Sequence, residues 1–140
     1  MRFFVDFDQL TVDSTSYDGE IGLAFTGTVG NRSVVLDADF TFSDGGMTEI
    51  DLSNVSISVG EAGVVIDGSG SLVTPSVAAT FATSAVTWAG ECLPTSGSLD
   101  YTSGSTSATI TFLNSTPIDG VVTVQVGSFV TNVALLPPCI

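Results

Sequence analysis

The chain has 140 residues and a formal net charge of −13, with 15 acidic residues, two basic residues and no histidine. Because so few cations are present to neutralise phosphates, we exclude nucleic acid and anionic membrane surfaces as partners. The lack of histidine excludes Ser-His-Asp and Cys-His catalysis, so we expect a protein that is not an enzyme.

Apolar and polar side chains alternate along most of the chain, as they do in half-buried antiparallel strands. Turn residues interrupt every run and leave connections that are too short for parallel crossovers, so neighbouring strands should pair as a meander. The expected strands cover about 3–13, 19–29, 33–42, 47–59, 63–73, 77–88, 98–103, 107–113, 120–126 and 129–135.

Two of these strands change the parity of their apolar residues halfway along. The change falls between Phe7 and Leu10 in the first strand, and between Leu52 and Val55 in the fourth. One extra residue in a strand moves every later side chain to the other face. A β-bulge at residues 8–9 and another at 53–54 would therefore restore a single apolar face, and we predict both.

Together these elements predict an all-β fold. We expect an antiparallel meander of about ten strands, in a curved sheet that closes as a barrel or packs as a two-layer sandwich. Residues 1–140 should form one domain, given this length. Within it, an acidic meander at 1–89 precedes a Ser/Thr-rich part at 90–140, which the cysteines enclose.

Cys92 and Cys139 are the two cysteines of the chain. They are either inert thiols or a disulfide, and the extracytoplasmic character of the composition favours the disulfide. The bond would close a loop of 47 residues, from 92 to 139. Chain entropy alone would then stabilise the fold by about 4 kcal/mol.

The last third of the chain also carries a recognisable pattern. A Cys-Leu-Pro-Thr-Ser-Gly turn at 92–97 is followed by Thr- and Val-rich strands and a closing Pro-Pro-Cys at 137–139. This pattern resembles the C-terminal part of exported β-rich lipoproteins of Gram-negative bacteria. The resemblance implies export and a disulfide, and it implies no catalytic residue. The lipidated cysteine that such proteins carry near their start is not in this chain.

The composition and the resemblance both indicate an extracytoplasmic location, which means secreted, periplasmic or at the cell surface. Met1 and Arg2 lead directly into a predicted strand. We therefore expect that a targeting segment has been removed upstream of this chain.

Functional groups concentrate on the polar side of the early strands. Alternation places Asp6 with Asp8, and Asp37 with Asp39, and Asp51 would join them where the strands approach. Clustered carboxylates without basic partners favour a hard cation, and calcium is the first candidate outside a cell. The alternative is a solvated acidic face that holds no cofactor and gives solubility.

Trp88 and Tyr101 are the candidate ligand-binding aromatics, because together they could form a platform on which a sugar stacks. The alternative for Trp88 is packing against the disulfide. The nine phenylalanines of the chain fill a core, or line a cavity for an apolar ligand if the sheet closes.

We expect a non-enzymatic structural or adhesive β-domain, with calcium as an optional ligand. Two alternatives stay open, a barrel-like carrier of a lipid or other apolar ligand and a carbohydrate-binding module. The expected partner is accordingly a surface protein, a glycan or an apolar molecule.

Overall fold

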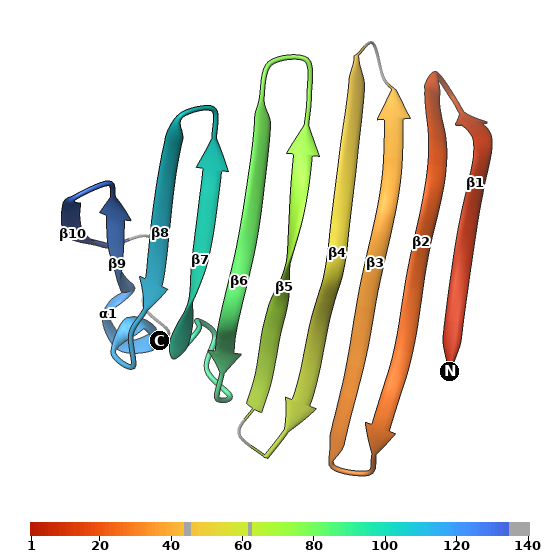
Figure 1. The fold of residues 1–140 in the computed structure, drawn as a ribbon. Helices are drawn as coiled ribbons and strands as arrows, with labels where there is room; N and C mark the ends of the chain where they lie inside the picture. Colours follow the sequence, from red (N-terminus) through yellow and green to blue (C-terminus); the bar gives the residue numbers. More distant parts are fainter. Residues whose placement is uncertain (44–45, 62, 135–140) are drawn as a thin grey trace.

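The strands of this protein pair in chain order, from β1 to β10, in one antiparallel sheet (Figure 1). The structure is a computed structural model that describes residues 1–43, 46–61 and 63–134. The predicted antiparallel meander is therefore confirmed. The strands are β1 (Arg2–Val12), β2 (Thr15–Thr28), β3 (Asn31–Ser43), β4 (Met47–Gly60), β5 (Gly63–Val73), β6 (Ala78–Trp88), β7 (Ser96–Ser103), β8 (Thr106–Phe112), β9 (Val121–Val126) and β10 (Phe129–Ala134).

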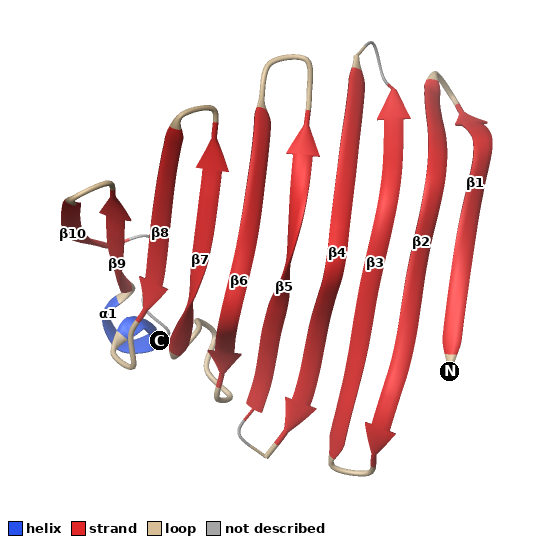
Figure 2. Ribbon diagram, viewed as in Figure 1, coloured by secondary structure: helices blue, strands red, loops and turns tan. Residues whose placement is uncertain are grey.

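The sheet is open, with β1 and β10 at opposite ends of the row of strands (Figure 1). Of the two forms expected for a curved sheet, the barrel is therefore not adopted. Closure requires the first and last strands to meet in register. Here the two edge strands differ in length, because β1 has 11 residues and β10 has 6. Figure 2 shows that the described strands form a single layer.

Both predicted β-bulges are present. The register of β1 against β2 shifts between Phe7 and Leu10, and that of β4 against β5 shifts between Ser53 and Ser56. Gln9 and Asn54, which lie within these shifts, have φ angles of 47° and 52°. Each extra residue returns the later apolar side chains to the face of the earlier ones.

A third bulge, in β6, was not predicted. It lies between Ser84 and Thr87, and Ala85 within it has a φ of 47°. Small residues surround the site, so the change in apolar parity from Phe81 to Val86 is weakly marked in the sequence. As in β1 and β4, one extra residue shifts the register and moves the later side chains to the other face.

Replacing Ala85 by glycine should stabilise the protein by about 1 kcal/mol, because a left-handed backbone strains alanine but not glycine. Thermal or urea unfolding measures the difference. Asn54→Gly is the matched control at the β4 bulge. Asparagine tolerates this conformation, so its gain should be only a few tenths of a kcal/mol. A loss of stability in Ala85→Gly would contradict the assigned backbone.

Alternation along each strand, with its parity reset at the bulges, divides the strand side chains into two faces. Residues that are directly opposite in the register share a face, and one such row runs Phe25, Val34, Ile57, Ile66 and Val86 from β2 to β6. We call this side the apolar face. Its apolar members are Phe3, Val5, Phe7, Leu10, Val12, Tyr17, Ile21, Leu23, Phe25, Val34, Leu36, Ala38, Phe40, Phe42, Ile50, Leu52, Val55, Ile57, Val59, Val64, Ile66, Leu72, Ala79, Phe81, Val86, Trp88, Leu99, Tyr101, Ala108, Ile110, Phe112, Val122, Val124, Val126, Phe129 and Val133.

The opposite side, which we call the polar face, is rich in serine, threonine and carboxylates. Every acidic residue that has a cross-strand partner in the described register lies on this side. These residues are Asp6, Asp18, Glu20, Asp37, Asp39, Glu49, Asp51, Asp67 and Asp100.

Few side chains of the apolar face are buried. Val86 and Val122 are 3% and 2% exposed, whereas Phe3 and Phe25 are 51% and 41% exposed. Aromatic rings do contact one another on this face. Phe3 and Phe25 lie 5.9 Å apart between ring centroids, edge to face. The phenylalanines of the apolar face thus form a surface layer on the single sheet instead of a filled core, and Phe4 lies on the other face.

One short helix, α1 (Thr116–Asp119), precedes β9. The buried Thr116 hydroxyl donates a hydrogen bond to the Val121 carbonyl at 2.8 Å and accepts one from the Leu113 N–H at 2.8 Å. Gly120, with a φ of 68°, ends the helix. No helix within the described ranges is long and apolar enough to cross a membrane.

Candidate functional site: the polar face of β1–β4

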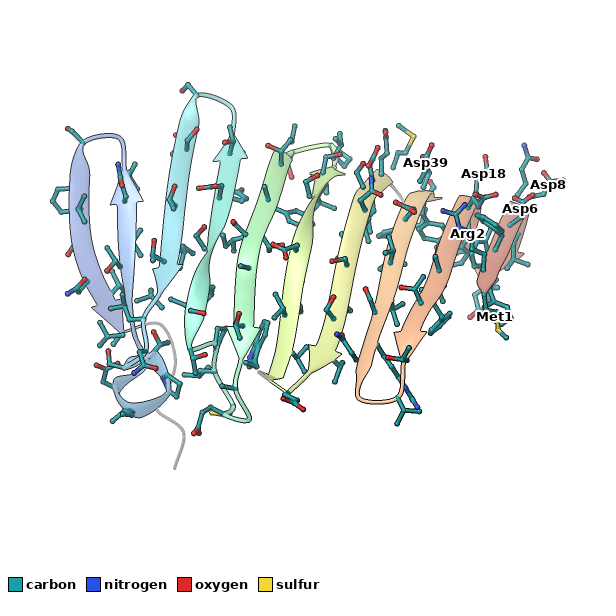
Figure 3. All side chains as sticks on the ribbon, turned by 60° about the horizontal axis from the view of Figure 1, so that its bottom comes forward. Met1, Arg2, Asp6, Asp8, Asp18 and Asp39 are labelled. Carbon is teal, nitrogen blue, oxygen red and sulfur yellow. The ribbon has the colours of Figure 1, made fainter. Side chains whose placement is uncertain are left out.

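Four carboxylates stand in one row across the first four strands. Asp6 is opposite Glu20, Glu20 is opposite Asp39, and Asp39 is opposite Asp51. Because neighbouring strands lie about 4.8 Å apart, this carboxylate row places like charges side by side. Figure 3 shows Asp6 and Asp39 over β1 and β3. An open hollow lies along the row and is lined by Glu20, Asp39 and Asp51, among others.

The structure thus brings together three of the five predicted cation ligands, Asp6, Asp39 and Asp51. Glu20 completes the row but was not predicted as a ligand. Its parity in β2 marks it as polar-facing, but only the register of β2 between β1 and β3 places it level with Asp6 and Asp39.

The other two predicted ligands lie at bulges. Asp8 belongs to the β1 bulge and has no cross-strand partner in the register. Asp37 accepts a hydrogen bond of 2.7 Å at Oδ1 from the backbone N–H of Asn54, at the β4 bulge. Its carboxylate therefore serves the backbone of the neighbouring strand.

The same contact recurs at all three bulges. The N–H of Gln9 donates to Asp18 Oδ1 at 3.4 Å, and the N–H of Ala85 donates to Asp67 Oδ1 at 2.5 Å. A bulge leaves its extra residue outside the ladder, so that its N–H needs another acceptor. We call Asp18, Asp37 and Asp67 the bulge-capping carboxylates. Asp18 and Asp67 were not singled out in the sequence, because only the folded register brings them opposite a bulge.

No group of three or more metal-ligating side chains is arranged to hold a metal ion within the residues that the structure describes. Calcium binding at Asp6, Asp8, Asp37, Asp39 and Asp51 therefore stays a prediction. The geometry itself shows a row of repelling carboxylates and a set of carboxylates that cap bulges.

Replacing Asp39 by asparagine should raise the free energy of unfolding by about 0.5–1 kcal/mol. Asp39 has a like charge on each side, and each such pair is unfavourable by a few tenths of a kcal/mol or more. Urea unfolding in low salt measures the gain, which should shrink in 0.5 M NaCl because salt screens exposed charges. Glu61→Gln, in the exposed turn after β4, is the control. A less stable Asp39→Asn variant would show that the carboxylate is needed.

Trp88 and Tyr101 both lie on the apolar face, but they do not meet. Trp88 is opposite Val64 near the end of β6, whereas Tyr101 is opposite Phe81, farther along that strand. At about 3.3 Å per residue, the two rings are separated by roughly 20 Å along the strands. They therefore do not form a common platform for one sugar ring.

Cys92 is exposed in the segment between β6 and β7 and is not a free cysteine. The other half of the predicted disulfide, Cys139, falls outside the described residues. The bond between Cys92 and Cys139 therefore stays a prediction.

Comparison of the chain with protein-family models, with curated proteins and with solved structures found no match. The function is therefore inferred from the chemistry of the two faces. The polar face can present carboxylates and hydroxyls to solvent, and the apolar face offers a wide hydrophobic surface.

Proposed function

We propose that this protein is a non-enzymatic structural or adhesive β-domain that works outside the cytoplasm by packing its apolar face against a protein partner. The observation that carries the proposal is the continuity of the apolar face, which crosses all ten strands. A sheet with one hydrophobic face must bury that face against another layer. Large exposed apolar patches mark interaction sites.

The composition supports the absence of catalysis. Histidine is missing from the whole chain. The polar face of β4–β7 carries an open hollow that is lined largely by serine, threonine and aspartate. Export is supported by the near absence of basic residues and by the resemblance of the last third to exported lipoproteins. The predicted disulfide fits the same environment.

The two alternative functions have less support. A carrier of the lipocalin kind needs a closed barrel with an interior cavity, and the described strands leave the sheet open. A carbohydrate module centred on Trp88 and Tyr101 needs the two rings within reach of one ligand, and their separation of roughly 20 Å argues against it.

Photo-crosslinking in cells that produce the protein tests the proposal. A photoreactive amino acid replaces either Ile66 on the apolar face or Val65, which is adjacent on the polar face and equally half-buried. We expect covalent adducts from position 66 and few from position 65. Equal yields at the two positions, or none at either, would count against a partner on the apolar face.

A further inference from the structure

The accessible surface of the single chain is larger than its mass requires. The chain exposes 8664 Å². A compact monomeric protein of 14.3 kDa exposes about 6,800 Å² on the usual scaling with mass. The difference, about 1,900 Å², is accessible surface that a compact fold of this mass would bury.

This difference matches what a stable dimer buries. Standard interfaces remove about 800 Å² from each partner, and obligate dimers remove about 1,000–2,500 Å² or more. Covering one apolar face on each of two copies would therefore give an interface in the obligate class. It would also bury exposed aromatic side chains of the apolar face, among them Phe3 and Phe25.

The distribution of charge allows two copies to meet on this side. Each copy carries a net charge of −13, which would oppose association if the acidic residues lay at the contact. The paired strand carboxylates, however, all lie on the polar face. When two apolar faces meet, these carboxylates point outward on the two sides of the assembly, separated by both sheets.

We propose that the partner of the apolar face is a second copy of this chain, and that two sheets pack face to face as a two-layer sandwich about a two-fold axis. The inference rests on the proposed function and specifies its partner. A second copy has a face of the same width and composition, so every strand of one sheet can be covered by the other. Sheets that pack in this way lie about 10 Å apart and interdigitate their inner side chains.

The first experiment measures the mass of the purified chain in solution by light scattering and sedimentation. The unmodified protein should be a dimer at micromolar concentration. Ile66→Asp, in the fifth of the ten strands, should weaken dimerisation about 100-fold or more, because an unpaired charge would be buried in the interface. Val65→Asp, on the polar face of the same strand, should leave the dimer intact. A dimer that survives Ile66→Asp would indicate pairing through the strand edges and overturn the face-to-face arrangement.

A second measurement needs no substitution, in case Ile66→Asp fails to fold. Trp88 is the single tryptophan of the chain and lies on the apolar face. On dilution through the dissociation range, its emission should shift to the red and become more accessible to iodide, while the far-ultraviolet circular dichroism stays unchanged. A monomer at all concentrations, with Trp88 always accessible, would overturn the dimer.

Photo-crosslinking at position 66 separates the two proposals. An adduct of twice the chain mass supports the second copy. An adduct of another mass, together with a monomer in solution, keeps the proposed function and rejects the second copy. No adduct, together with a monomer, rejects both.

Discussion

Gly97→Ala should destabilise the protein by about 3 kcal/mol or more, which lowers the melting temperature by roughly 10 °C for a chain of this length. Gly97 has a φ of 98°, and it lies opposite the β6 bulge, where the two backbones approach closely. A Cβ atom at this position would lie 2.5 Å from the Val86 Cα and would also collide with the Ala85 carbonyl oxygen. Backbone strain and overpacking therefore add.

Gly104→Ala is the matched control, in the turn between β7 and β8. Gly104 also has a positive φ, 58°, but apart from its chain neighbours no described residue has an atom within 4 Å of the Cβ position. Its replacement should cost only about 1 kcal/mol, the cost of a left-handed alanine. Equal losses in the two variants would mean that the backbones do not approach closely at the β6 bulge.

Asp37→Ala should lower the free energy of unfolding by about 1.5 kcal/mol. The variant removes the acceptor for the Asn54 N–H, and hydrogen bonds to charged groups contribute about 1.5–3 kcal/mol. We expect the lower end of this range because Asp37 is exposed and lies near the carboxylate row, so its removal also relieves repulsion. Urea unfolding at neutral pH measures the loss.

Asp37→Asn distinguishes a bulge cap from a calcium ligand. The asparagine oxygen still accepts the N–H of the bulge, so this variant should retain most of the stability. If Asp37 were instead a calcium ligand, added calcium would stabilise the unmodified protein more than Asp37→Asn. Calcium-independent unfolding of both proteins, with only Asp37→Ala impaired, supports the cap. An Asp37→Ala variant as stable as the unmodified protein would show that Asp37 does not cap the bulge.

The bulges show how far local pattern predicts this fold. At residues 8–9 and 53–54, large apolar side chains stand on both sides of the break, so the change of parity is unambiguous. At Ala85 the neighbouring side chains are small, so the same change of parity is not apparent in the sequence. The strand boundaries follow from turn residues and alternation, which act over a few positions.

The positions of the carboxylates follow only in part from the pattern along each strand. Parity along a strand correctly placed Asp6 and Asp51 on the polar side. Which carboxylates lie opposite one another depends on the registers of β1–β4. These registers place Glu20 in the row with Asp6 and Asp51, and they place Asp37 beside the β4 bulge. Register is a property of paired strands, so that no single strand contains it.

By itself, the sequence determined the all-β class, the order and approximate extent of the strands, and the separation of charged from apolar side chains, because each depends on side-chain alternation and short turns. Only the tertiary structure decided that the sheet stays open, which carboxylates stand together, and that no other described element covers the apolar face. These features depend on contacts between distant strands. The parity of side chains along one strand says which way they point, but not which strand lies opposite or whether β1 meets β10.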